Sequence, residues 1–415
     1  MKKKITFFIL TLMFACMVTA CGKETQGDPT SNEGDAEVSV EEQMGLKCPL
    51  PNTHNEVKQL TIGCFEDEVY KKLIEELQEK NGISFGELSS DDMKKYSELK
   101  SKKGYEIVDK RGKITIAASN SEMLYVALTK VLYGEEQKNY TESYQFPTRE
   151  EYIKNPDTFV TAWEYLWSPP EWLLSYDEKQ EAFNKHTRPM IWAHRGGSDY
   201  YPDNSIEAII SSIQMGADVM ELDFRYTKDG VLVLIHDETL YSSTDWAKKK
   251  GKNGLPTSDK VQDWTYDELQ QLNLKSGNVF SRLSTSEYKI PTLEEVLQVC
   301  EGRVFFVMDK INTYEEWDTI HSAITNTKCA SAFAFAYKFP SSEVGKAQIQ
   351  LKNEFGKCGP YFYLKKHSGD LETEALGTEQ RLHVYDKCSS VSNAAIMTNY
   401  VRDLVEYVDR NYGEK

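Results

Sequence analysis

Short apolar runs alternate with stretches of helical periodicity from Pro189 to the end of the chain. Eight of these runs have the length of a single strand: Ile191–His194, Val219–Phe224, Val231–His236, Val304–Met308, Ala332–Tyr337, Tyr361–Leu364, Leu382–Tyr385 and Ala395–Thr398. Helices are expected between several of them, at Ser205–Met215, Leu293–Cys300, Tyr314–Asn326 and Glu343–Phe355. Strands that alternate with helices form parallel sheets, and eight of them in roughly 225 residues predict a (β/α)8 TIM barrel.

The second of these runs carries two carboxylates. Glu221 and Asp223 are two residues apart in a strand, so they project from one face, while Met220, Leu222 and Phe224 project from the other. A strand with two buried carboxylates needs a counter-charge, because a buried unpaired charge is costly. Near the C-terminal end of a barrel strand, this pair fits a site for a hard metal cation. The alternative is a surface strand in which polar and apolar residues simply alternate.

Two histidines bracket these carboxylates in the sequence. His194 ends the first apolar run and His236 ends the third. Barrel enzymes place their catalytic groups at the C-terminal ends of strands. The stretch from Ile191 to Leu240 is therefore the predicted active-site region.

This region resembles the glycerophosphodiester phosphodiesterase family. The motifs that carry the resemblance are His194–Gly196, Pro202–Ser205, Gly216–Asp218 followed by Glu221 and Asp223, Thr227–Gly230 before His236–Asp237, and Ile290–Leu297. Their order and spacing resemble the family's from about residue 189 to residue 415. Residues 237 to 290 would be the family's insertion, and the resemblance says nothing about residues 22 to 150.

The resemblance implies a role for each matching residue. His194 and His236 would be the catalytic histidines, acting as general acid and base on a phosphodiester. Arg195 would bind a phosphate oxygen through its planar fork of donors. Glu221 and Asp223 would hold a divalent ion, Ca²⁺ or Mg²⁺, that neutralises phosphate charge and polarises a reacting oxygen. Asp237 would orient the neighbouring histidine or its loop.

Two places depart from the family's pattern. The fourth family strand often carries an acid, a spacer and a lysine, whereas Asp309 and Lys310 are adjacent here. Neighbouring residues of a strand face opposite ways, so one of the two must lie beyond its end. We expect Asp309 as a third metal ligand and Lys310 as a phosphate contact; the alternative is an exposed pair at the strand end. The family's Thr-Asp-x-Pro motif is replaced by Thr398–Val401, which removes an acid near the barrel mouth.

The expected activity is metal-dependent hydrolysis of a small glycerophosphodiester to glycerol 3-phosphate and an alcohol. One alternative is cleavage of a lipid headgroup, as in the related phospholipase C and sphingomyelinase D types, which need an apolar rim at the barrel mouth. Another is a surface-anchored binding protein with a decayed barrel. The net charge of −16, from 65 acidic and 49 basic residues, argues against a general nucleic-acid partner. No feature predicts a particular protein partner.

The N-terminus has the pattern of an export signal. Lys2–Lys4 form a basic start, and Ile5–Met17 are apolar but too short to span a bilayer comfortably. The run ends in Val18–Cys21, which resembles a bacterial lipobox, so residues 1–21 are expected to be a signal and Cys21 to carry lipid. Residues 22–45 would be a flexible polar tether. The expected location is the outer side of the cell membrane, and the alternative is an ordinary signal peptide.

Residues 46–150 are predicted to form a small, mostly α-helical module of unknown function. Helices are expected at Glu66–Glu79, from about Ser89, and at Ser121–Leu132. Residues 151–188 are rich in aromatic side chains and are expected to connect this module to the barrel and pack on it. After the signal, six cysteines leave disulfide pairing open, with Cys48–Cys64 one possible bridge and buried thiols the alternative.

Overall fold

The structure is a computed structural model of the 415-residue chain. It describes residues 54–65, 71, 74, 75, 77–79, 82–160, 188–197, 201–275, 288–301, 303–309, 335–337, 370, 371 and 395–413. The signal, the tether, residues 161–187, Lys310, and the expected strands Tyr361–Leu364 and Leu382–Tyr385 lie outside these residues. So do the expected helices Tyr314–Asn326 and Glu343–Phe355. No helix in the described ranges is long and apolar enough to cross a membrane.

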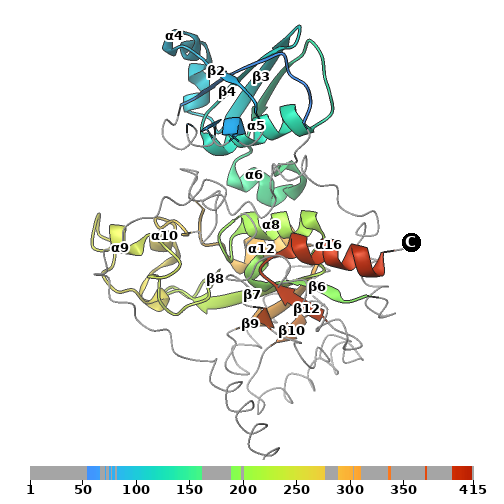
Figure 1. The fold of residues 1–415 in the computed structure, drawn as a ribbon. Helices are drawn as coiled ribbons and strands as arrows, with labels where there is room; N and C mark the ends of the chain where they lie inside the picture. Colours follow the sequence, from blue (N-terminus) through green and yellow to red (C-terminus); the bar gives the residue numbers. More distant parts are fainter. Residues whose placement is uncertain are drawn as a thin grey trace, which may run out of the picture. The chain divides into compact units, whose positions relative to one another are not determined.

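Residues 54–148, called the N-terminal domain below, contain a mixed five-stranded sheet (Figure 1). The strand order is β2 (Phe85–Glu87), β1 (Gln59–Cys64), β4 (Lys113–Ala118), β3 (Gly104–Lys110) and β5 (Thr141–Gln145). Strand β1 is parallel to both neighbours, and β3 is antiparallel to both of its own. The long helix of this domain, α5 (Ser121–Tyr133), packs on the sheet with most of its residues buried.

This sheet corrects the expectation of a mostly helical module. Alternate residues of β1 and β4 are buried, among them Leu60 and Ile62, and the sheet is stabilised by that apolar face. Such alternation over six residues is a weaker signal than the longer helical period of residues 66–79. The helices themselves are confirmed where the chain is described: α5 begins as expected, and the Ser89 hydroxyl accepts from the Asp92 amide at the start of α4 (Ser90–Met93).

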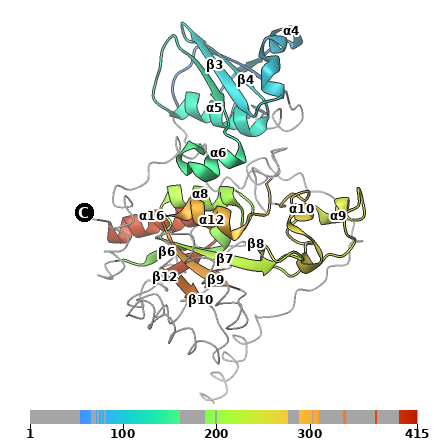
Figure 2. The ribbon, with the colours of Figure 1, turned by 180° about the vertical axis from the view of Figure 1, so that it is seen from behind.

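The C-terminal domain contains a parallel sheet (Figures 1 and 2). The path runs β10 (Phe335–Tyr337), β9 (Phe305–Asp309), β7 (Val219–Tyr226), β6 (Met190–Ala193), β12 (Ala395–Thr398) and β11 (Asp370–Leu371). Starting from β6, the strands follow the chain in one direction, and the last strands of the chain lie on the other side of β6. The first strand, β6, pairs in parallel with both the second strand, β7, and the last, β12. That cyclic order is the order of a (β/α)8 barrel, as the sequence predicts.

One predicted barrel strand is wrong. Residues 231–236 contain β8 (Leu232–Leu234), which pairs antiparallel with β7 and is not one of the parallel strands of the sheet. A parallel crossover needs about a dozen residues or more, whereas only five lie between Tyr226 and Leu232. Gly230, with φ 80°, allows the tight turn that returns the chain as a hairpin. Val233 and Leu234 of β8 are buried, which explains why the run resembles an interior strand.

Three helices lie on one face of the parallel sheet: α8 (Ile206–Met215), α12 (Leu293–Cys300) and α16 (Val401–Tyr412) (Figures 1 and 2). The first two match the predicted helices. Ser205 caps α8 through the Ala208 amide, and Thr292 and Glu295 form a reciprocal capping box on α12. The insertion carries α9 (Trp246–Lys249), the 3₁₀ turn η6 (Val261–Asp263) and α10 (Tyr266–Leu269).

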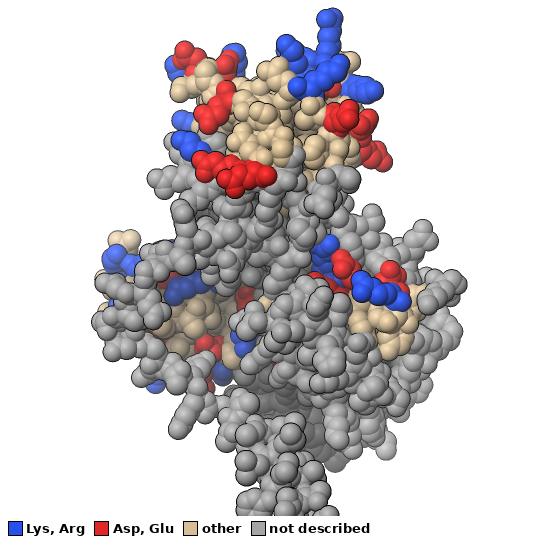
Figure 3. Space-filling model, in the orientation of Figure 1, with Lys and Arg blue, Asp and Glu red and all other residues tan. Residues whose placement is uncertain are grey.

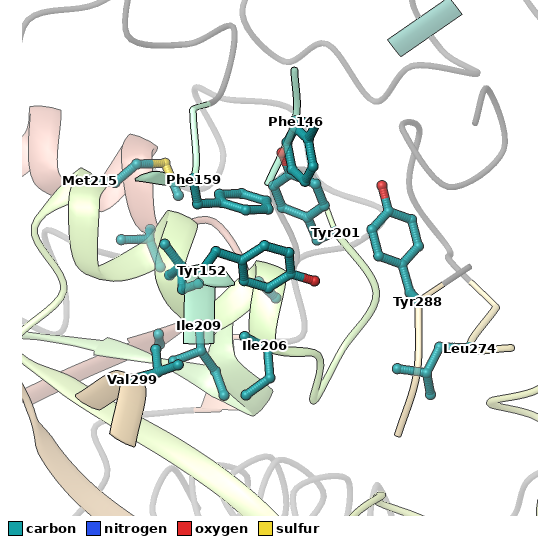
Figure 4. Close-up of a cluster of buried hydrophobic side chains, with 14 of the residues drawn as sticks. Phe146, Tyr152, Phe159, Tyr201, Ile206, Ile209, Met215, Leu274, Tyr288 and Val299 are labelled. Atoms are coloured by element: carbon teal, nitrogen blue, oxygen red, sulfur yellow. The ribbon is translucent and has the colours of Figure 1, made fainter. Parts of the chain in front are cut away.

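The described part of the connector, residues 151–160, packs on α8 and its preceding loop. Helix α6 (Arg149–Lys154) contributes Tyr152, whose hydroxyl donates to the buried carboxylate of Glu207. Phe159 lies edge-on to Tyr152 and to Tyr201, with centroids 5.2 and 5.4 Å apart (Figure 4). Buried aromatic side chains in such T-shaped arrangements contribute large apolar area, so they hold this segment in place.

Candidate active site

A sharp turn brings His194 and Arg195 to the C-terminal end of β6. Arg195, Gly196 and Gly197 all have positive φ, at 52, 82 and 83°. A Cβ on Gly197 would lie 2.2 Å from the Ser212 hydroxyl oxygen, so only glycine fits there. The same hydroxyl donates to the Gly196 carbonyl at 2.6 Å. The chain after His194 is thus seated on α8.

Asn399 holds the imidazole of His194. Its side-chain oxygen lies 2.7 Å from Nδ1 of His194. Ala193 and Thr398 are register partners at the ends of β6 and β12, so the residues that follow them meet. An amide oxygen can only accept, and Nδ1 therefore donates, which leaves Nε2 of a neutral ring with a free lone pair.

The predicted carboxylate pair is buried at the neighbouring strand end. Glu221 and Asp223 are each 1% exposed on β7. The Arg195 amide donates to Glu221 Oε2 at 3.0 Å. The Asn204 side chain bonds both the side chain and the backbone of Asp223. Its Nδ2 donates to Oδ2 at 3.1 Å, and its Oδ1 accepts from the Asp223 amide at 3.3 Å. The turn and the loop after it are thereby fixed to the carboxylates.

The remaining oxygen of this pair bears on cation binding. Asp223 Oδ1 is buried and accepts no hydrogen bond from the described residues. The Arg195 Nε is 3.8 Å from the other oxygen, Oδ2, so this guanidinium compensates the charge only in part. A buried carboxylate oxygen without a donor is costly, and a cation would satisfy it. The chemistry of the pair therefore fits a divalent ion.

No third ligand completes a metal site among the described side chains, where no group of three or more His, Cys, Asp and Glu is placed to hold an ion. The backbone of Asp309 ends β9 and is the register partner of Asp223. That position is the one expected for the third ligand, but the Asp309 side chain and all of Lys310 lie outside the description.

His236 follows the β8 hairpin and has an acidic partner. Its Nδ1 is 2.6 Å from Asp237 Oδ1, and the other Asp237 oxygen accepts from the Ser242 hydroxyl. The Arg225 guanidinium donates to the His236 carbonyl at 2.9 Å through Nη2, which fixes the backbone. The hydrogen bond from His236 is the main cause that lowers the pKa of Asp237 to about 2.

Arg195 links the two histidine positions electrostatically. Its positive charge is among the causes that lower the pKa of Asp237, after the contacts with His236 and Ser242 and against the opposing effect of burial. Its guanidinium also lies 3.4 Å from Asp203. The positive group therefore acts on Asp237, the partner of His236, as well as on Asp203.

Four residues of this arrangement received no role from sequence reasoning: Asn204, Arg225, Ser242 and Asn399. Asn204 stands inside one of the family motifs, which could have pointed to it. Asn399 stands where the family's acid is missing, and the sequence predicts only the loss of that acid. Arg225 and Ser242 have no sequence signal, since their contacts depend on how the hairpin and the insertion fold.

This region is similar to proteins of one known family. Residues 194–350 match the sequence model of the Glycerophosphoryl diester phosphodiesterase family. The chain is 38% identical over 117 residues to the uncharacterized protein YqiK of Bacillus subtilis, covering 28% of this chain and 42% of that protein. It is 36% identical over 126 residues to a glycerophosphodiester phosphodiesterase of Caldanaerobacter subterraneus, covering 30% and 46%. Residues 194–350 are therefore similar to the glycerophosphodiester phosphodiesterase family.

The matched part is limited. The chain spans less than half the length of these two curated relatives. Among solved structures, a glycerophosphoryl diester phosphodiesterase from Parabacteroides distasonis is 22% identical with a TM-score of 0.38, covering 57% of this chain and 92% of that one.

Proposed function

We propose that the protein hydrolyses glycerophosphodiesters to glycerol 3-phosphate and an alcohol with the help of a divalent cation. The observation that carries the proposal is the pair of histidines, each held through Nδ1, that follow β6 and β8, two strands that both pair with β7 and its buried carboxylate pair. The family of residues 194–350 supports the same reaction class.

The phosphate would be held by the guanidinium of Arg195, in the turn after β6. Arg195 is partly exposed, with 26% of its side chain accessible, and its planar fork suits two oxygens of a phosphate. The proposed ligands of the cation are Glu221, Asp223 and Asp309. When bound, Ca²⁺ or Mg²⁺ would neutralise phosphate charge at this position.

The two histidines would divide the proton transfers. His194 keeps a neutral amide beside Nδ1, so its Nε2 suits a general base that takes a proton from the attacking water as the water oxygen bonds to phosphorus. His236 has a carboxylate beside Nδ1, and an ionised partner stabilises the positive charge that a general acid carries. His236 would then protonate the departing alcohol as its bond to phosphorus breaks.

One assay tests this proposal. Purified protein is incubated with glycerophosphocholine, with chelator alone and after readdition of Ca²⁺ or Mg²⁺, and the products are identified. Metal-dependent release of glycerol 3-phosphate and choline is the expected result. Release of a phosphorylated headgroup from a phospholipid instead would favour the lipid-cleaving alternative, and no turnover of either substrate would favour a binding protein with a decayed barrel.

We also propose that the mature protein begins at Cys21, is lipidated there and lies on the outer side of the cell membrane. The basic start, the short apolar run and the lipobox-like Val18–Cys21 support this. Several acyl chains would hold the protein stably, whereas a single chain binds only marginally. Cys21→Ser should release the protein from the membrane fraction; an unchanged membrane fraction would contradict the anchor.

A further inference from the structure

The insertion presents a surface whose charge opposes that of the chain as a whole. Four lysines lie within five residues on α9 and the turn after it, Lys248, Lys249, Lys250 and Lys252. No acidic residue occurs from Trp246 to Ser258, although the whole chain carries a net charge of −16. We call these four lysines, together with Tyr241, the lysine–tyrosine patch.

Three of these lysines are available to a partner. Lys248, Lys250 and Lys252 are exposed, and none of them forms an ion pair with any residue that the structure describes. Lys249 differs, because its ammonium group is bound to Asp245 at 3.0 Å and to the Gln271 carbonyl at 2.6 Å. Three exposed ammonium groups, none of them in an ion pair with a described residue, thus lie beside Lys249, which is held by contacts within the protein.

An exposed aromatic ring belongs to the same surface. Tyr241 is 59% exposed, and its ring lies edge-on to Trp246 with centroids 6.2 Å apart. Lys250 lies over the Trp246 ring at 4.2 Å, and Lys275 over the Tyr241 ring at 5.2 Å. The aromatic rings and the ammonium groups therefore form one continuous cluster.

The patch is held on a fixed frame. The Trp246 and Trp264 indole nitrogens both donate to the Ser258 carbonyl at 2.8 Å. The Gly251 amide donates to the Pro256 carbonyl, which closes the turn that carries the lysines. Beside Tyr241, Ser242 donates to Asp237, the partner of His236. The patch is consequently held in a defined position at the side of the site that contains His236.

We propose that the lysine–tyrosine patch docks on a membrane surface rich in anionic phospholipid. Clustered lysines are attracted to the negative potential of such a surface, and a tyrosine ring with its hydroxyl favours the headgroup region. Nucleic acid fits less well, because residues 241–260 contain no arginine and the chain is strongly acidic. The expected anchor at Cys21 would keep the patch near a membrane. The proposal does not depend on hydrolysis.

Vesicle binding tests the proposal directly. The chain from Gly22 onward keeps every described residue and lacks the apolar leader, so binding through the leader is removed. Its partition onto vesicles of phosphatidylglycerol and phosphatidylcholine is compared with that onto phosphatidylcholine alone by sedimentation. Preference for the anionic vesicles, falling as salt is raised, is the expected result.

Matched variants locate the surface. K248Q/K250Q/K252Q should weaken partition onto anionic vesicles by roughly fivefold for each lysine removed. K94Q/K95Q/K102Q removes the same charge from the N-terminal domain, where these lysines pair with Asp91, Asp92 and Glu98, and should change partition little. Figure 3 shows acidic and basic side chains mixed on that domain. Tyr241→Ser should cause a smaller loss, and unchanged thermal unfolding would confirm that the variants fold.

Three outcomes would overturn the proposal. The first is equal partition onto anionic and neutral vesicles. The second is an equal loss in both triple variants, because net charge alone would then explain binding. The third is tighter binding of a single-stranded oligonucleotide than of vesicles through the same lysines, which would identify a nucleic-acid surface.

Discussion

The two histidines of the site are held in the same way by chemically different partners. His194 donates from Nδ1 to the neutral amide of Asn399, which lies beyond the last barrel strand. His236 donates from Nδ1 to the carboxylate of Asp237, its own neighbour in the chain. Both rings are fixed in orientation and tautomer, but only the second has a negative charge beside it. Under the proposed mechanism, the two partners would therefore suit two identical side chains to opposite proton transfers.

The carboxylates between the histidines should give the largest effect. Removing the cation leaves Glu221 and Asp223 with Arg195 as their nearby positive group, and both proposed proton transfers depend on a phosphate bound there. Chelation should abolish turnover, and readded Ca²⁺ or Mg²⁺ should restore it and raise the melting temperature. A metal titration followed by thermal unfolding should show weaker binding for Glu221→Gln. If the Asp309→Asn titration overlays that of the wild type, Asp309 is not a ligand.

Loss of either imidazole should come next. His194→Ala and His236→Ala should each lower kcat by roughly 10² to 10⁴-fold, the usual contribution of a positioned acid or base. Thermal unfolding should change little, because both side chains are only partly buried. His54→Ala, in the N-terminal domain, is the matched control. Near-normal turnover of either active-site variant would remove that histidine from the mechanism.

The partners should then separate the two roles. Asp237→Asn removes the charge beside His236 and should cost about tenfold in kcat, whereas Asn399→Ala removes a neutral contact and should cost about fivefold. If His236 is the acid, Asp237→Asn should move the alkaline limb of the pH–rate profile to lower pH. Asn399→Asp adds a charge beside His194 and should move the acidic limb to higher pH. Shifts of the opposite limbs would reverse the assignment of acid and base.

The difference between the partners also shows what could be predicted from the sequence. The two histidines, the carboxylate pair and Asp237 lie in one stretch of about fifty residues, where local spacing and the family motifs identify them. Asn399 is 205 residues from His194 and meets it only because the first and last strands pair. Ser242 depends in the same way on the fold of the insertion. Contacts made by the barrel's closure leave no local pattern.

The same difference separates the parts of the fold that the sequence predicts from those that it does not. The cyclic strand order and the helices α8 and α12 follow from long, regular patterns, and the prediction is confirmed there. The sequence predicts a barrel strand for the β8 run because its residues are apolar, but a short turn forces the run into a hairpin. In the N-terminal domain, the six-residue strands β1 and β4 were overlooked beside helical periods more than twice as long.

The smallest expected effect concerns stability, and it again contrasts the two partners. Asp237 has a pKa of about 2 in the folded protein, below its ordinary value of about 3.9, so its ionised form stabilises the fold. That contribution is present above about pH 4 and is lost as pH falls toward 2. It should be modest, because the carboxylate is partly exposed and screened by water.

Urea midpoints at pH 7, 4 and 3 should fall less steeply for Asp237→Asn than for the wild type. Asn399→Ala removes no ionisable group and should leave the slope unchanged. If the urea midpoints of the wild type and Asp237→Asn fell in parallel with pH, the bond to His236 would not favour the folded state. The charge difference between the two histidines would then rest on the pH–rate profiles alone.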